Sequence, residues 1–148
     1  MTPLPVGAVP PPPAFPGQHE AAEQLVLALT SKNTETYASL LADDVQVFVD
    51  GKVVARTKAE WMARFGEKLA APGVFFKVIQ GYSSTGRVLL IEYFSSTASW
   101  GTKIPTDCCW SYDAVAYDYD HKSNKVVAIH RLTGGSEKLD EHGKPAGY

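Results

Sequence analysis

The chain has 148 residues, of which 45% are hydrophobic and 20% are charged, as in globular proteins and unlike disordered chains. This length is usual for one domain. The 14 Lys and Arg residues and 16 Asp and Glu residues give a net charge of −2, which argues against a nucleic-acid partner recognised through a basic surface. No apolar run approaches the roughly 20 residues of a membrane span, so no membrane partner is predicted.

The two cysteines, Cys108 and Cys109, are neighbours in the chain. Neighbouring residues of a strand point to opposite faces, so a disulfide between them would be strained. Two buried thiols in a reducing compartment are therefore predicted, which indicates a cytoplasmic protein.

The composition separates both ends of the chain from its middle. Seven of the ten prolines lie in the first 16 residues, so residues 1–17 are predicted to form an extended, Pro-rich N-terminal arm. A passive tail, a strap on this chain or a dimer partner, and an SH3-type ligand are all open readings of that arm. Residues 135–148 are polar and aperiodic and are predicted to be a C-terminal tail. One folded domain over residues 18–134 remains.

Three helices are predicted from apolar periodicity and capping signals. Gln18 to Thr30 places apolar side chains on one face. Asn33 can cap a short second helix whose Tyr37 faces inward. Thr57 and Glu60 form a capping box that opens a third helix, in which Trp61, Phe65 and Leu69 recur every four residues before Pro72 and Gly73 end it.

The rest of the chain is predicted to form strands. The strands span Val45–Val49, Lys52–Ala55, Val74–Ser83, Arg87–Trp100, Lys103–Tyr119 and Lys125–Thr133. Asp50 and Gly51 are a strong hairpin signal between the first two strands. Helices grouped ahead of consecutive strands favour an α+β fold over a parallel βαβ sheet.

This order of elements, with the phrase Tyr-Ala-Ser-Leu-Leu-Ala-Asp-Asp-Val at residues 37–45, resembles the nuclear transport factor 2-like (NTF2-like) superfamily. That superfamily includes ketosteroid isomerases and SnoaL-like polyketide cyclases, and the resemblance covers about residues 18–134. It implies a cone-shaped, curved antiparallel sheet wrapped around the N-terminal helices, with a pocket at the wide end. It also implies a homodimer through the outer face of the sheet, where Trp100 and Trp110 are expected.

The isomerases of this superfamily use a carboxylate base, a tyrosine and a protonated aspartic acid, and the chain matches one of the three. The base position falls on Val49, and the hairpin explains Asp50 without catalysis. The tyrosine position is Leu25. Asp113, five residues before Asp118, matches the spacing of the strand aspartate. The ketosteroid isomerase mechanism itself is therefore not predicted.

Strand alternation places Asp107 and Tyr117 on the face of Asp113. The resemblance directs Arg131 of the last strand inward, where it could meet Asp113 or Asp107. Asp113 and Arg131 are the candidate catalytic residues; an internal ion pair, a ligand-orienting role and acid–base chemistry all remain open. Glu92 lies among apolar residues and needs a partner or an edge position, and its face is undecided.

The predicted function is binding of a small, largely hydrophobic ligand in the cone pocket, with cofactor-free isomerase, cyclase or dehydratase chemistry by proton transfer. The alternative is a non-catalytic dimeric module that binds a ligand or a protein. No metal is predicted, because the four histidines lack metal-ligand spacing. The residues expected to bind the ligand are Tyr37, Trp61, Phe65, Tyr93, Asp107 and Tyr117.

Overall fold

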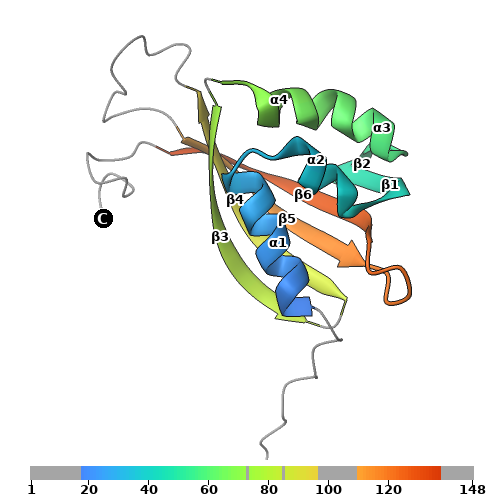
Figure 1. The fold of residues 1–148 in the computed structure, drawn as a ribbon. Helices are drawn as coiled ribbons and strands as arrows, with labels where there is room; N and C mark the ends of the chain where they lie inside the picture. Colours follow the sequence, from blue (N-terminus) through green and yellow to red (C-terminus); the bar gives the residue numbers. More distant parts are fainter. Residues whose placement is uncertain (1–17, 73, 85, 97–109, 138–148) are drawn as a thin grey trace, which may run out of the picture.

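The computed structural model describes residues 18–72, 74–84, 86–96 and 110–137, and it follows the predicted order of elements (Figure 1). The Pro-rich arm, Trp100, Asp107, Cys108 and Cys109 lie outside the described residues, as does the side chain of Trp110, so the predictions made for them stay predictions. Within the described ranges, no helix is both long and apolar enough to cross a membrane.

Three helical segments cover one face of a curved sheet (Figure 1). Helix α1 spans Gln18–Thr30 as predicted, and α2 spans Thr34–Ser39 with Asn33 as its N-cap. The third helix is continuous but has three parts, α3 (Lys58–Trp61), a π-helical turn η1 (Met62–Gly66) and α4 (Glu67–Ala70).

Six strands form one sheet in the order β2-β1-β6-β5-β4-β3. The strands are β1 (Leu41–Val49), β2 (Lys52–Ala55), β3 (Val74–Ser84), β4 (Arg87–Ser96), β5 (Trp110–Tyr119) and β6 (Val126–Glu137). The prediction of a wholly antiparallel sheet is wrong at one place, because β1 and β6 pair in parallel. The third helix carries the chain from β2 at one edge to β3 at the other, and three successive antiparallel pairings then bring β6 beside β1 in the same direction.

Three strands extend beyond their predicted bounds, β3 by Ser84 alone and β1 and β6 by four residues at one end. β1 begins at Leu41 instead of Val45, since Leu41 pairs with Val126. β6 continues past Thr133 to Glu137, so the first residues of the predicted C-terminal tail belong to the sheet. They do so because β5 extends far enough to pair with them, and Trp110 lies opposite Glu137.

The third helix directs its apolar side at the core and contains a π turn. Thr57 caps the helix by accepting a hydrogen bond from the Glu60 amide at 3.1 Å. Glu60 accepts from the Arg56 amide at 2.9 Å rather than from Thr57, so the predicted capping box closes one residue early. Trp61, Phe65 and Leu69 are all buried, as their spacing predicts. A π turn places an extra residue in one turn, and such turns are frequent at functional sites.

The hairpin between β1 and β2 also anchors β6. Asp50 and Gly51 both have positive φ angles, 50° and 82°, as an Asp-Gly hairpin turn requires. The Asp50 carboxylate accepts hydrogen bonds from the Thr133 amide at 2.9 Å and the Thr133 hydroxyl at 2.8 Å. The φ angles confirm that Asp50 is a turn residue. The two hydrogen bonds lower the pKa of its carboxyl below the usual value.

The outer face of the sheet, away from the helices, carries an apolar row. Ile79, Ile91, Ala114 and Leu132 pair side by side across β3, β4, β5 and β6, and we call this row the outer stripe. Leu132 is 60% exposed and Ile79 is 49% exposed. The helix-covered face and the outer stripe therefore use alternate residues of the same strands.

Candidate functional site

Three charged side chains meet on the inner face of the sheet. Glu92 of β4 pairs opposite Asp113 of β5, and Arg131 comes from β6 on the other side of β5. Arg131 Nη2 lies 2.9 Å from Asp113 Oδ2 and 3.0 Å from Glu92 Oε1. Arg131 Nε also donates to Asp113 Oδ2, at 3.3 Å. One guanidinium therefore joins two carboxylates from two neighbouring strands.

The Arg131 side chain is 4% exposed, and its guanidinium lies against two aromatic rings. Its central carbon is 5.1 Å from the Phe65 ring centroid and 5.6 Å from the Trp61 ring, within the range of a cation–π contact. The two rings stack on each other with centroids 4.9 Å apart. Burial lowers the pKa of Arg131, but attraction to Glu92, and then to Tyr117, Tyr37 and Asp113, outweighs it, so its pKa lies above the ordinary value.

A chain of hydrogen bonds continues from Glu92 into the core. The Tyr117 hydroxyl donates to Glu92 Oε2, and the hydroxyls of Tyr117 and Tyr37 are 3.4 Å apart. Trp61 Nε1 donates to the Tyr37 hydroxyl at 3.2 Å. Burial, and then the charge of Glu92, raises the pKa of Tyr37 to about 12 and that of Tyr117 well above its usual range. The network thus satisfies one oxygen of a fully buried glutamate with a neutral phenol.

The network ends at a pocket of about 210 Å³. Its lining combines apolar and basic side chains with a single carboxylate. The lining residues are Val49, Val54, Trp61, Arg64, Phe65, Lys68, Asp113 and Arg131. Apolar walls with a few convergent polar groups are typical of ligand sites.

Two of these groups make the pocket chemically distinctive. Arg131 Nη1 is buried and has no hydrogen-bond partner among the described residues. Lys68 Nζ lies 3.2 Å from the centroid of the Phe94 ring. Burial, together with repulsion from Arg131, lowers the pKa of the Lys68 amine below its ordinary value. The pocket therefore contains two cationic groups, Arg131 and Lys68, that have N–H donors free for a ligand.

The structure brings most of the predicted site residues together, in two layers. Asp113, Arg131, Trp61 and Phe65 line the pocket. Tyr37 and Tyr117 lie behind them, fully buried in the hydrogen-bond chain.

Tyr93 is misplaced by the prediction. Glu92 points inward and alternation turns Tyr93 to the outer face, where its ring lies 5.6 Å from that of Tyr112. Asp107, also predicted to bind the ligand, is outside the described ranges.

Sequence reasoning missed two residues of the site. For Glu92, the sequence does not decide which face of the sheet the side chain occupies, although an acidic residue between apolar neighbours is a signal for a buried ion pair. For Lys68, the only signal in the sequence is its spacing, because it follows Phe65 by three residues and shares a side of the helix with it.

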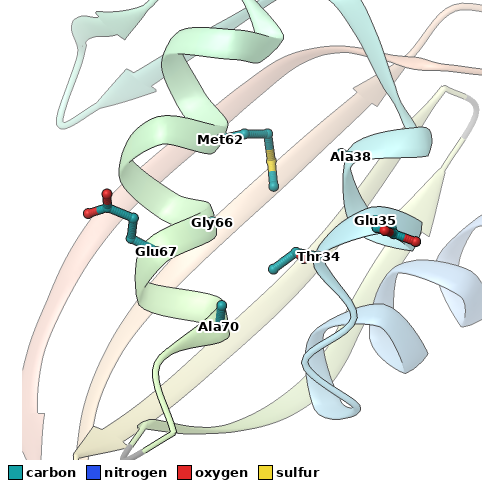
Figure 2. Close-up of a pocket in the computed structure, with 7 residues that line it drawn as sticks. All are labelled: Thr34, Glu35, Ala38, Met62, Gly66, Glu67 and Ala70. Carbon is teal, nitrogen blue, oxygen red and sulfur yellow. The ribbon is translucent and has the colours of Figure 1, made fainter.

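A second, larger groove of about 470 Å³ runs between α2 and the η1–α4 part of the third helix (Figure 2). Met62 and Thr34 extend into it, whereas the carboxylates of Glu35 and Glu67 point away (Figure 2). Converging polar groups are what orient a ligand, and this groove lacks them among its lining residues. Nor do three His, Cys, Asp or Glu side chains gather as metal ligands anywhere in the described part of the chain.

The fold is shared with solved structures of low sequence identity. A Δ5-3-ketosteroid isomerase from Mycobacterium sp. is 17% identical with a TM-score of 0.60, covering 82% of this chain and 98% of that one. An NTF2-like protein of unknown function from Cytophaga hutchinsonii is 10% identical with a TM-score of 0.58, covering 78% and 88%. A Mycobacterium tuberculosis epoxide hydrolase of the LEH-like type is 16% identical with a TM-score of 0.53, covering 77% and 80%. No family model matches the chain, and no curated protein matches it in sequence.

The chain therefore has the NTF2-like fold, an α+β cone with an open, curved sheet, and the resemblance drawn from the sequence is confirmed at the level of the fold. In this protein, a buried arginine lies between two carboxylates and lines a small pocket.

Glu92→Gln should lower the free energy of unfolding by about 3 kcal/mol or more, because it leaves the buried Arg131 with one carboxylate fewer. The double change Glu92→Leu with Arg131→Met should recover much of this loss, since it removes both buried charges. Urea unfolding of the three proteins checks this. Equal destabilisation by the single and double changes would contradict it.

The free energy of unfolding should fall as the pH rises from 10 to about 12. The raised pKa of Tyr37 means that the folded state holds its proton while the unfolded state releases it, so this contribution is complete below pH 10 and lost above it. A shift from 10.0 to about 12 corresponds to about 3 kcal/mol.

Tyr37→Phe should flatten that fall, although it lowers the stability at neutral pH by removing the bonds to Trp61 and Tyr117. Urea unfolding at about pH 9 and about pH 12 measures both effects. An unchanged slope in the variant would show that Tyr37 does not cause the alkaline loss.

Proposed function

We propose that this protein binds a small, largely apolar ligand in the pocket lined by Arg131, and that Asp113 transfers a proton to or from that ligand. The observation that carries the proposal is the position of Asp113, which reaches the pocket while held by Arg131 at 2.9 Å. Its side chain is 18% exposed, whereas that of Glu92 is fully buried. Asp113 is thus the carboxylate of the pair that a ligand can reach.

The pairing with Arg131 defines the chemistry that Asp113 can do. A carboxylate that accepts hydrogen bonds from a guanidinium is an acceptor and a base, not a hydrogen-bond donor. It therefore fits removal of a proton from an acidic carbon better than the protonated oxyanion-hole role of the isomerase aspartate. A positioned base of this kind contributes roughly 10²- to 10⁴-fold to a rate and requires no cofactor.

The size of the pocket limits the ligand. Sites for drug-sized ligands usually enclose about 300–1,000 Å³, and this pocket has about 210 Å³. The ligand should accordingly be smaller than a steroid, despite the shared fold with a ketosteroid isomerase. Val49, Val54 and the edges of Trp61 and Phe65 would contact its apolar part.

A thermal-shift screen of small ketones, alcohols, esters and carboxylic acids should yield compounds that stabilise the protein. A ligand at one hundred times its Kd adds about 2.7 kcal/mol to the free energy of unfolding. Asp113→Asn should weaken or abolish the shift. Asp118→Asn, five residues along the same strand and paired with Arg87 on the other face, is the matched control and should keep it.

For a ligand with an acidic C–H bond, NMR in D₂O should show protein-dependent exchange of that proton. Asp113→Asn should slow the exchange by roughly a hundredfold or more, because the amide is not a base. Binding without exchange in the wild type would leave a non-catalytic ligand-binding module. An absence of binding by the whole screen would overturn the proposal.

We also propose that the protein is a homodimer through the outer stripe. Contiguous exposed apolar side chains on a sheet face are characteristic of protein interfaces, and Ile79 and Leu132 are about half exposed or more. A second copy of the same face would cover them by a two-fold axis, the commonest symmetry of homo-oligomers.

Size-exclusion chromatography with light scattering should give twice the chain mass for the wild type, and Leu132→Lys should shift it towards the monomer. A lysine there would place two like charges near the two-fold contact and desolvate them. Leu27→Lys is the matched control, since Leu27 is 66% exposed on α1, away from the outer stripe. A monomeric wild type, or equal effects of both changes, would contradict the dimer.

A further inference from the structure

We infer that the ligand of this pocket carries a carboxylate, and that Arg131 Nη1 and the Lys68 ammonium bind it while the apolar walls hold the rest of the molecule. The inference rests on the proposed function, because it specifies the ligand class of the same pocket. It adds a requirement for negative charge that the proposed function does not contain.

The first support is a buried donor with no acceptor. Arg131 donates hydrogen bonds from Nη2 and Nε to Asp113 and forms an ion pair with Glu92, and its side chain is 4% exposed. Arg131 Nη1 and Glu92 Oε1 have no hydrogen-bond partner among the described residues. A buried, charged N–H group without an acceptor is costly, so native structures usually supply one. Since Arg131 lines the pocket, a ligand oxygen can be that acceptor.

The second support is the charge of the lining. Arg64, Lys68 and Arg131 line the pocket with Asp113 as the single acidic residue among the lining side chains. Asp113 is already engaged by Arg131. In the described part of the chain, Lys68 Nζ contacts the Phe94 ring and forms no ion pair. Glu92, behind the lining, is also paired with Arg131. The three basic side chains and the two carboxylates therefore leave one positive charge in excess, which an anionic ligand would balance.

The third support is that both cations are partly removed from water. Charge-assisted hydrogen bonds are stronger where the local dielectric is low, so an anion gains more here than at an exposed lysine. A carboxylate has two oxygens, one for Arg131 Nη1 and one for Lys68 Nζ. Its apolar remainder would lie against Val49 and Val54.

The test uses 3-phenylpropanoate and its neutral amide, 3-phenylpropanamide, with a panel of aliphatic and aromatic monocarboxylates and their amides, and phenylphosphonate as a second anion. Isothermal titration calorimetry measures each Kd. At least one carboxylate should bind roughly tenfold to a hundredfold more tightly than its amide, which is the range for hydrogen bonds to charged groups.

Lys68→Gln should remove most of that preference, and Lys68→Arg should restore it. Lys122→Gln, in the exposed loop between β5 and β6, makes the same charge change outside the pocket and should leave every Kd unchanged. Circular dichroism and Tm confirm that each variant is folded. We use Lys68 rather than Arg131 because loss of the buried arginine would itself destabilise the protein.

The pH dependence provides a second readout. Lys68 faces Arg131, Asp113 and Glu92 on the sheet and shares its helix with Arg64, and burial holds the pKa of its amine below that of an ordinary lysine. The ammonium is lost as the pH rises through this pKa, so carboxylate affinity should fall in the wild type. In Lys68→Arg it should persist to higher pH, because arginine keeps its proton.

The outcomes separate the two proposals. Equal binding of carboxylates and amides, with dependence on Asp113 retained, would overturn the requirement for charge and leave the proposed ligand pocket intact. Binding of phenylphosphonate in place of every carboxylate would also overturn it, in favour of a different anion. Failure of all carboxylates, amides and screened compounds to bind would overturn both.

Discussion

The buried guanidinium of Arg131 is the interaction on which the rest of this structure depends. A charge that is 4% exposed must be compensated where it lies, and the compensation comes from Glu92 and Asp113 on β4 and β5. Because of this requirement, the charged side chains of β4, β5 and β6 lie on the same face of the sheet. It also explains why Glu92, alone among apolar neighbours, is fully buried.

The same requirement shapes the core around the pocket. The second oxygen of Glu92 accepts from Tyr117, which approaches Tyr37, which accepts from Trp61. Trp61 stacks on Phe65, and the Phe65 ring packs against the guanidinium of Arg131. Core and pocket wall are thus one continuous network. A change in any of these side chains would alter stability and ligand affinity together. Lys68 forms no ion pair among the described residues, so its substitution reports on function more directly.

Much of the fold could be predicted because its signals are local. Helix α1, the Asp50 turn and the buried side of the third helix follow from periodicity and turn chemistry, and they occur where predicted. The parallel pairing of β1 with β6 could not be predicted in this way, because it depends on how the third helix carries the chain across the whole sheet. The extension of β6 to Glu137 depends likewise on a partner strand distant in sequence.

In the candidate site, too, the residues fixed by local signals could be predicted and those that depend on distant segments could not. Alternation along β5 brings Asp113 and Tyr117 to one face, and the resemblance directs Arg131 towards them, as the structure shows. Alternation alone does not say which face of β4 is inner, so Glu92 stayed unassigned and Tyr93 was placed in the pocket. Arg131 resolves this, because its charge requires Glu92 inside. Lys68 needed the helix to be docked on the sheet before its nearness to Arg131 could be known.

Because side chains alternate along a strand, consecutive residues of β5 and β6 lie on opposite faces of the sheet. Ala114 follows Asp113 on β5, and Leu132 follows Arg131 on β6, so each of these pocket residues has an outer-stripe residue as its chain neighbour. Asp50 ties the β1–β2 turn to Thr133, the next residue along β6. A partner that covers Leu132 would hold the backbone from Arg131 to Thr133 in place from outside. The proposed dimer contact and the proposed ligand site would thus share one stretch of β6, with Leu132 on the outer face and Arg131 in the pocket.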